Sequence, residues 1–379
     1  MQLRNLINKQ ILVRISGLSE GSRVRGVLNS VRPGMITVMS PKGRHIIPIR
    51  SISSVMKANR VSFSLIQVIV ANFSSNNVTL IDSNPRDIVN LGVGKAPRDI
   101  GVTPTTPNGS NVYVLNSGSN SVSMFSTTTE ASTTIEKGIG TLPKRIAILP
   151  NGAFAYVTNF ESNDISIINT GTNTVTQRIK GFSGPCGIAA SSNRVYVVNS
   201  NLDFVSVLRV SDNTLIGKPI PVGSSPDSIV LTPDGSKAYV TNTVNHNVSV
   251  ISTRNNKVIG KPIPVGKEPL GIAVTPNGAF VYVANNMSNT ISVIRTSDDT
   301  VVNTISSNKL FFPLGVAIDP NGTVYVTNNG TPNNLVPNSG TIVVIKNNMV
   351  VEQINLIDAR GNAGDSPGAI AIAVFPPLF

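Results

Sequence analysis

Apolar and polar residues alternate along most of the chain in short runs, which glycine, proline and asparagine interrupt. Residues 248–251 read Val-Ser-Val-Ile, and residues 291–294 read Ile-Ser-Val-Ile. Alternation with a period of two places successive side chains on opposite faces of a β-strand. No apolar run reaches the roughly 18 residues that a membrane-spanning helix would need. The pattern predicts an all-β protein made of many short strands.

A motif of the form Tyr-Val-x-Asn returns six times along the chain, after one degenerate copy. The motifs are separated by 44, 43, 40, 43, 43 and 43 residues and end at Asn72, Asn116, Asn159, Asn199, Asn242, Asn285 and Asn328. Around every motif but the first stand a Pro-x-x-Ile or Pro-x-x-Val strand, a turn that often reads Pro-Asn-Gly, and two further strands. Four antiparallel strands in each of seven repeats predict a seven-bladed β-propeller, with an open β-solenoid as the alternative.

The way in which the ring closes can also be predicted. The first repeat lacks its Pro-x-x-Ile strand, and the last copy of that strand lies at residues 367–375. We therefore expect this C-terminal strand to complete the first blade. Residues 216–223 and 259–266 share the string Ile-Gly-Lys-Pro-Ile-Pro-Val-Gly, whose prolines predict an outer edge strand. An insertion within residues 329–341 is expected to form an exposed loop.

The repeat resembles a known family of β-propellers. Residues 156–159, 239–242 and 325–328 read Tyr-Val-Thr-Asn, the motif of the repeat family found in bacterial and archaeal surface-layer and related proteins. The resemblance spans residues 61–379 and implies a propeller fold.

Charge divides the chain into two parts. The sequence has 31 Lys and Arg against 19 Asp and Glu, a net charge of +12. Residues 1–60 hold eleven of these bases and a single acid, Glu20, so that nearly all of the excess lies there. The composition predicts a small basic domain over residues 1–60 and the propeller over residues 61–379.

The basic domain is expected to contain a short helical turn and five strands. Its pattern is similar to an Sm-like or SH3-like small barrel, on the strength of residues 21–28 and 45–52. Its candidate binding residues are Arg14, Arg23, Arg25, Arg32, Lys42, Arg44 and Arg50. Such a domain attracts polyanions, but it has no aromatic side chain on which bases could stack. The possible partners are an acidic protein or the propeller itself, nucleic acid, and an anionic surface polymer or lipid.

Candidate site residues of the propeller lie where the inner strands open into the central channel. The charged residues after the inner-strand prolines are Arg98, Asp99, Lys144, Arg145 and Asp227. Two carboxylates are few for a calcium ion, which takes six to eight oxygen ligands. We therefore expect ion pairs at the channel mouth, with no metal and no cofactor.

Other catalytic chemistry has few candidate groups in this sequence. The two histidines, His45 and His246, have no evident nucleophile or metal-ligand partners. The single cysteine, Cys186, follows an inner-strand proline, where a buried hydrophobic residue is expected. No phosphate-binding or dinucleotide-binding glycine motif is present. These observations predict that the protein is not an enzyme.

The sequence therefore favours a non-catalytic structural or interaction protein. Its ring has few charges, and we expect it to assemble on a cell or spore surface through protein partners or self-association, with residues 1–60 as the tether. The N-terminus lacks the apolar core of a signal peptide, which predicts synthesis in the cytoplasm. The alternative is a nucleic-acid-associated protein that binds polyanions through residues 1–60, and a channel that binds a small molecule is a third possibility.

Overall fold

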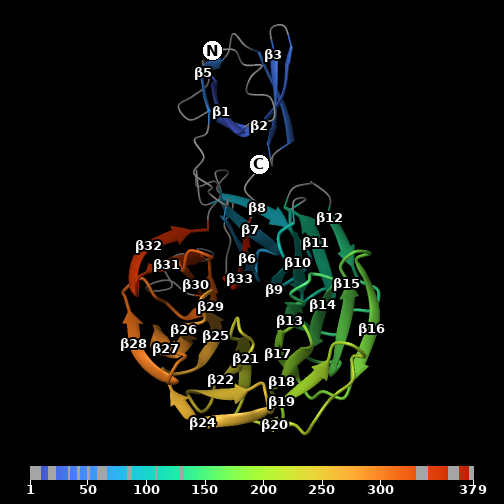
Figure 1. The fold of residues 1–379 in the computed structure, drawn as a ribbon, viewed down its shortest axis with the longest axis vertical. Helices are drawn as coiled ribbons and strands as arrows, with labels where there is room; N and C mark the ends of the chain where they lie inside the picture. The colour runs from blue at the N-terminus through green and yellow to red at the C-terminus, as the bar shows by residue number, and fades with distance from the viewer. Residues whose placement is uncertain are drawn as a thin grey trace.

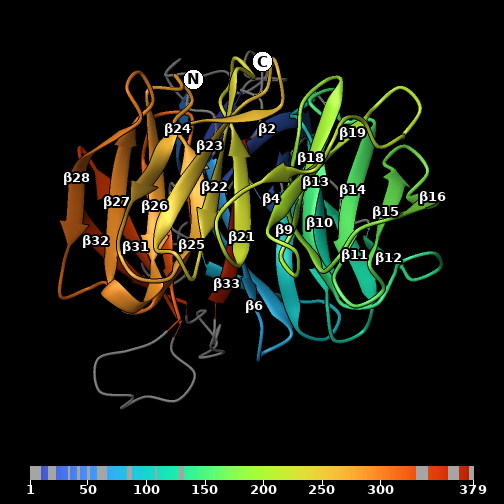
Figure 2. The same cartoon turned by 90° about the horizontal axis from the view of Figure 1, so that it is seen from below.

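Seven four-stranded antiparallel sheets stand around a central axis as the blades of a propeller (Figure 1). The structure, a computed structural model, describes residues 66–82, 88–106, 109–127, 132–329, 340–356 and 367–374, together with the backbone of five strands between residues 10 and 57. Figure 2 shows the blades from the side, with their strands running across the thickness of the ring. The predicted all-β fold with seven blades is confirmed.

Each blade contributes one strand to each of four concentric positions. The inner strands are β33 (Pro367–Val374), β9 (Pro97–Val102), β13 (Pro143–Ile148), β17 (Pro185–Ala190), β21 (Pro226–Leu231), β25 (Pro269–Val274) and β29 (Pro313–Ile318). The second strands are β6 (Ile66–Asn72), β10 (Asn111–Asn116), β14 (Phe154–Asn159), β18 (Arg194–Asn199), β22 (Lys237–Asn242), β26 (Phe280–Asn285) and β30 (Val324–Asn328). Every inner strand begins at a proline, and every second strand ends at the asparagine of the repeated motif.

The outer half of each blade follows the same plan. The third strands are β7 (Asn77–Asp82), β11 (Ser121–Ser126), β15 (Asp164–Asn169), β19 (Phe204–Arg209), β23 (Asn247–Ser252), β27 (Thr290–Arg295) and β31 (Thr341–Lys346). The outer strands are β8 (Ile88–Gly92), β12 (Ser132–Ile135), β16 (Thr174–Lys180), β20 (Ile220–Pro221), β24 (Lys257–Pro264), β28 (Thr300–Ser306) and β32 (Met349–Asn355). The repeated Ile-Gly-Lys-Pro string contributes to β20 and β24, at the predicted outer edge.

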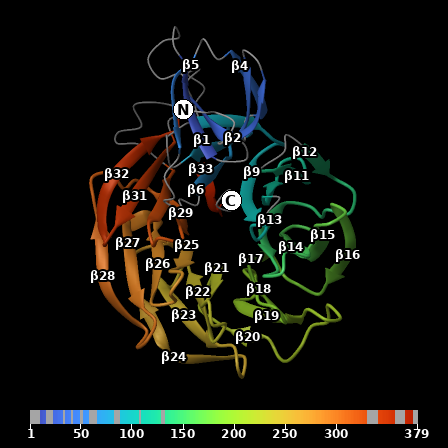
Figure 3. The same cartoon turned by 45° about the horizontal axis from the view of Figure 1, so that its top comes forward.

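The C-terminal strand closes the ring. β33 is the inner strand of the first blade and pairs antiparallel with β6, so that Pro367 lies opposite Asn72 and Ile370 opposite Val70. Figure 3 shows β33, in red, beside β6, in blue. The predicted closure is confirmed.

A buried apolar cluster lies between each of the seven pairs of neighbouring blades. In the cluster between the second and third blades, Tyr113 and Leu115 of β10 pack with Val157 of β14. The last and first blades share a cluster of the same kind, which includes Val344 and Val70. Since the sheets pack face to face through alternate side chains, the period-two pattern of the sequence becomes the core of the ring.

Two residues of the repeated motif tie each blade to the next. The Tyr156 hydroxyl donates to Asn213 Oδ1 in the following blade, at 2.7 Å. The Thr158 hydroxyl donates to the backbone oxygen of Cys186 on the next inner strand, at 2.8 Å. Tyrosine and threonine of this motif therefore hold neighbouring blades in register.

The asparagine of the motif acts within its own blade, and a turn residue acts between blades. Asn159 Nδ2 donates to Asp164 Oδ1 at 2.8 Å and to Ser166 Oγ at 2.9 Å, both on the adjacent strand. Asn163, with a φ of 55°, accepts a hydrogen bond from the Gly184 backbone at 2.7 Å. The motif residues are thus engaged in holding the ring together.

Five further strands precede the propeller. They are β1 (Gln10–Ile15), β2 (Arg23–Arg32), β3 (Met35–Ser40), β4 (Gly43–Pro48) and β5 (Ile52–Lys57). They form one antiparallel sheet in the order β4-β3-β2-β1-β5, so the last strand returns to pair with the first. Its closure into an Sm-like or SH3-like barrel and the domain boundary at residue 60 stay predictions.

Two further observations complete the fold. Among the described residues, no helix has the length and apolar character needed to cross a membrane. The loop expected within residues 329–341 lies almost wholly outside the described residues.

Candidate functional site

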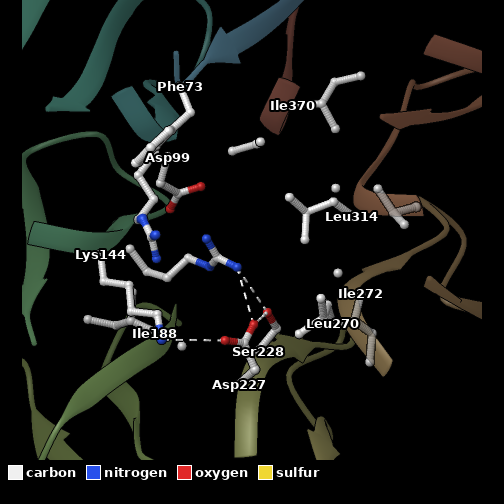
Figure 4. Close-up of a pocket in the computed structure, with 18 of the residues that line it drawn as sticks. Phe73, Asp99, Lys144, Ile188, Asp227, Ser228, Leu270, Ile272, Leu314 and Ile370 are labelled. Carbon is white, nitrogen blue, oxygen red and sulfur yellow. Dashed lines mark hydrogen bonds and ion pairs between the residues drawn. The ribbon is translucent and has the colours of Figure 1, made fainter. Parts of the chain in front are cut away.

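A cavity of about 570 Å³ opens at the centre of the ring, lined by residues of the inner strands (Figure 4). All five channel residues singled out from the sequence line this cavity: Arg98, Asp99, Lys144, Arg145 and Asp227. They come from β9, β13 and β21, and each occupies one of the two positions that follow the initial proline. Cavities of this size hold small molecules.

Asp227 is the centre of an ion-pair network on one side of the pocket. Its Oδ2 lies 3.2 Å from Arg145 Nη2, and its Oδ1 lies 3.6 Å from Lys144 Nζ. Ser228 Oγ donates to Asp227 Oδ2 at 2.8 Å, and Arg145 Nη2 is also 3.5 Å from Ser228 Oγ. These contacts hold the Arg145 guanidinium in place.

The two carboxyl groups of the pocket differ in their ionisation. Burial by itself would raise the pKa of Asp227, but the charges of Arg145 and Lys144 outweigh burial, and the pKa is lowered. Burial raises the pKa of Asp99, and the more distant charge of Arg145 does not cancel the rise. Asp99 Oδ2 accepts the backbone N–H of Ile146 at 2.8 Å, and among the described residues no cation forms an ion pair with it. Asp99 thus holds its proton more readily than Asp227.

Two cations of the pocket lie over aromatic rings. Arg98 Cζ is 5.5 Å from the centre of the Phe73 ring, and Lys144 Nζ is 4.7 Å from the centre of the Phe160 ring. Arg98 Nε is buried and has no hydrogen-bond partner among the described residues. Burial and the nearby charge of Arg145 lower the pKa of Arg98, but an arginine stays charged near neutral pH. The pocket therefore has a surplus of positive charge, which suits an anionic ligand.

Ser228 stands at a channel-mouth position but was not among the candidate site residues, and the structure places it in contact with both Asp227 and Arg145. The signal was available, because Ser228 stands two residues after Pro226, as Asp99 and Arg145 do after their prolines. Phe73 was also missed, since it lies outside the inner strands and reaches the pocket from the turn after β6.

The remaining candidate groups, Cys186 and His246, form no ion pair with the described charged residues of the pocket. Cys186 is fully buried, and burial, together with the charge of Asp227, raises the pKa of its thiol to about 11, so that the thiolate is scarce near neutral pH. His246 lies exposed in a turn and accepts the Glu268 backbone N–H at 3.2 Å. In the described part of the chain, no three His, Cys, Asp or Glu side chains are grouped as metal ligands.

For the basic residues of the N-terminal segment, the structure gives the strand on which each one lies and its neighbours in the sheet. Arg14 lies on β1 directly opposite Arg23 of β2, and Arg25 of β2 lies opposite Leu12. Arg32 ends β2 and Arg44 lies on β4, while Lys42 and Arg50 fall outside the described residues. Whether these residues form a binding surface stays a prediction.

Comparison with known proteins points to an enzyme family. The model of a family described as "Lactonase, 7-bladed beta-propeller" matches residues 186–355, somewhat less than half of the chain. A search of curated proteins returns no match.

Solved structures share the fold at low sequence identity. A functionally unknown protein from Desulfotomaculum acetoxidans DSM 771 has a TM-score of 0.65 and 18% identity, covering 82% of this chain and 99% of its own. A protein of Bacteroides fragilis NCTC 9343 with the provisional name 6-phosphogluconolactonase has a TM-score of 0.62 and 14% identity, covering 82% and 99%. Kuenenia stuttgartiensis hydrazine synthase has a TM-score of 0.55 and 22% identity, covering 65% and 76%.

The family match overturns two predictions made from the sequence. The expectation of a non-catalytic structural scaffold is wrong, and so is the expectation that the protein is not an enzyme. The second rested on histidines and a cysteine without partners and on missing metal and nucleotide motifs, none of which argues against catalysis by carboxyl groups. The match likewise points away from a nucleic-acid-associated protein as the function of the whole chain.

Proposed function

We propose that the protein is a hydrolase that opens a small anionic lactone in the central pocket. The observation that carries this proposal is the pair of half-buried carboxyl groups with opposite pKa shifts beside three cations, in one cavity of about 570 Å³. The match to the lactonase family model supports it, as does the similarity in fold to a protein with the provisional name 6-phosphogluconolactonase.

Asp99 is the general base of the proposed reaction. A base works best when its pKa lies near the working pH, and burial moves the pKa of Asp99 in that direction. The Asp99 carboxylate takes a proton from water as the water oxygen attacks the lactone carbonyl carbon. The ring C–O bond then breaks, and Asp99 returns the proton to the departing alkoxide oxygen. The product is an open-chain hydroxy acid.

The cations of the pocket stabilise negative charge at two places. Arg145, held by Asp227 at 3.2 Å, is positioned to stabilise the oxyanion that forms on the carbonyl oxygen. Arg98, which has an unpartnered Nε, is the anchor for the anionic group of the substrate. Ser228 is a poor nucleophile here, because its hydrogen-bond partner Asp227 has a lowered pKa and is a weak base.

The proposal is tested by measuring acid release from lactones that carry a carboxylate or a phosphate. We expect the full chain to hydrolyse such a lactone faster than buffer does. The Asp99→Asn variant should lose about 10²- to 10⁴-fold in kcat, while its amide oxygen can still accept the Ile146 N–H. The control is Asp298→Asn, in an exposed turn, which should keep full activity. Equal kcat in Asp99→Asn and the unchanged protein would contradict the role of Asp99.

The proposed reaction does not involve residues 1–60, whose binding partner is a separate question. An acidic surface polymer, a nucleic acid or a protein as the partner of this segment stays a prediction, as does deposition on a cell or spore surface.

A further inference from the structure

The central pocket has two chemically different sides (Figure 4). Asp99, Lys144, Asp227 and Ser228 gather on one side, whereas Leu270, Leu314 and Ile370 face them from the other. The apolar side is completed by Ile272, Val316 and Ala369. Within the lining, this side has no charged side chain.

The two sides follow from which blades supply them. The charged side comes from β9, β13 and β21, in the second, third and fifth blades, and the apolar side from β25, β29 and β33, in the sixth, seventh and first blades. Because β33 closes the ring beside β29, these last three inner strands are consecutive around the channel. Their apolar residues therefore form one continuous wall.

The strands of this wall pack closely. The side chains of Leu270 and Leu314 are partly exposed, whereas Ile370 is buried. A Cβ on Gly271 would lie 2.1 Å from the Leu314 backbone oxygen, and a Cβ on Gly315 would lie 2.7 Å from the Gly368 backbone oxygen. The glycines thus let neighbouring inner strands approach closely, while the leucine side chains beside them line the cavity. Asn329, directly after β30, also lines the cavity, but the side chains of Leu270, Leu314 and Ile370 offer a hydroxyl group no hydrogen-bond partner. A hydroxyl pressed against these side chains would lose its water without replacement, which is unfavourable.

We propose that the ligand of this pocket is an amphipathic anion, with its negative group on the side of Arg98 and Arg145 and an unsubstituted hydrocarbon part against the wall of Leu270, Leu314 and Ile370. The inference rests on the proposed function for the reaction and names the substrate class: a lactone with a hydrocarbon flank, and not the lactone of a polyhydroxylated sugar acid. Each methylene group that the wall buries should strengthen binding about fourfold.

The experiment compares two open-chain acids by isothermal titration calorimetry with the full chain. The probes are 5-hydroxyhexanoate and gluconate, since both are six-carbon hydroxy monocarboxylates and differ mainly in their hydroxyl groups. Neither contains a lactone, so binding is measured apart from catalysis. We expect 5-hydroxyhexanoate to bind at least tenfold more tightly, and 5-hydroxydecanoate, with four further methylene groups, more tightly still. Gluconate binding as tightly as 5-hydroxyhexanoate would overturn the inference.

Two variants test whether the preference for 5-hydroxyhexanoate over gluconate comes from the apolar side of the pocket. Leu314→Asn, which keeps the branched shape and the number of side-chain heavy atoms, should bring the ratio of the two affinities close to one, and its melting temperature shows whether the fold is kept. Arg98→Met should weaken both acids by a similar factor and leave the ratio unchanged. A Leu314→Asn variant that folds and keeps the full preference would place the hydrocarbon elsewhere and contradict the proposal.

These experiments distinguish a failure of the amphipathic-ligand inference from a failure of the proposed hydrolase function. Tight binding of 5-hydroxyhexanoate without hydrolysis of any lactone would keep the amphipathic ligand and remove the hydrolase. Hydrolysis that favours a sugar-acid lactone over a lactone with a hydrocarbon flank would keep the hydrolase and overturn the amphipathic ligand.

Discussion

The Tyr156 hydroxyl and the Asn159 side-chain nitrogen both donate hydrogen bonds within the ring. The same holds for the tyrosine and asparagine residues at equivalent places, such as Tyr196, which donates to Asn256, and Asn242, which donates to Ser249. The residues that recur are therefore those that hold the blades. The residues that line the pocket differ from blade to blade. The charged residues of the site therefore occupy positions that are not conserved between the repeats of this chain.

The opposite pKa shifts of Asp99 and Asp227 predict opposite effects on stability. In the unfolded chain both carboxyls ionise near pH 4. The folded protein keeps the Asp99 proton to higher pH, so the Asp99 carboxylate lowers the free energy of unfolding at pH 7 and has no effect below about pH 4. We expect Asp99→Asn to raise the melting temperature at pH 7 and to leave it nearly unchanged at pH 3.5, as measured by calorimetry.

The same substitution at Asp227 should have the opposite effect on stability. Its lowered pKa contributes stability above about pH 4, and this contribution is lost as the pH falls through the folded-state pKa. Asp227→Asn should lower the free energy of unfolding at pH 7 by on the order of 3 kcal/mol, because Arg145 and Lys144 are left without their partner. Shifts of the same sign in both variants at pH 7 would contradict the different ionisation of the two carboxyls.

The inner strands combine two functions, because they line the pocket and also pack against one another. Gly187, Gly271 and Gly315 all stand at the second position after the proline, where Asp99 and Arg145 line the pocket in other blades. At the three glycines, an added Cβ would meet the backbone of the next inner strand. The second residue after the inner-strand proline is therefore a glycine that allows close strand packing in some blades and a charged residue of the pocket in others.

Gly271→Ala is expected to destabilise the ring. Its new Cβ would fall 2.1 Å from the Leu314 backbone oxygen, so β25 and β29 would have to move apart. We predict a loss of about 2 kcal/mol in the free energy of unfolding, measured by denaturant titration. Gly92→Ala is the control, since its Cβ meets nothing within 4 Å, and it should be neutral or slightly stabilising. Equal stability of the two variants would show that the inner strands are not tightly packed here.

The elements were predictable because each signal in the sequence is local. Proline marks the start of each inner strand, asparagine the end of each second strand, and alternation the strands between them. The charged residues of the pocket were found in the same way, by counting from the prolines. The ionisation of Asp99 could not be predicted, since it depends first on how far the folded ring removes the carboxyl from water and then on which cations lie near it. The prediction that the protein is not an enzyme went wrong because it assigned the channel carboxylates Asp99 and Asp227 to ion pairs and gave them no catalytic role.

At the scale of the whole molecule, stability depends on one pairing between distant parts of the chain. β33 supplies the inner strand of the first blade, and its Ile370 contributes both to the apolar cluster between the last and first blades and to the pocket wall. Closure of the ring and completion of the pocket are therefore the same event.

Removal of residues 365–379 should open the ring. We expect the melting temperature to fall by on the order of 5–10 °C, because the apolar side chains of β33 leave the core, and ligand binding in the pocket should be lost with Ile370. The control is a chain that ends at Val374 and keeps β33 whole. If both shortened chains melted at the temperature of the full chain, the closure by β33 would contribute nothing to stability.

The pairing of β33 with β6 also has a consequence for the growing chain. The two strands are about 300 residues apart, so at 5–20 residues per second the ribosome needs about 15 to 60 seconds to deliver the second after the first. Throughout that interval β6 has no inner neighbour, and an unpaired strand edge is a site where other chains can add. The nascent protein is therefore most prone to aggregation on the blade that is begun first and finished last, and a molecular chaperone acting on it would have to protect that edge.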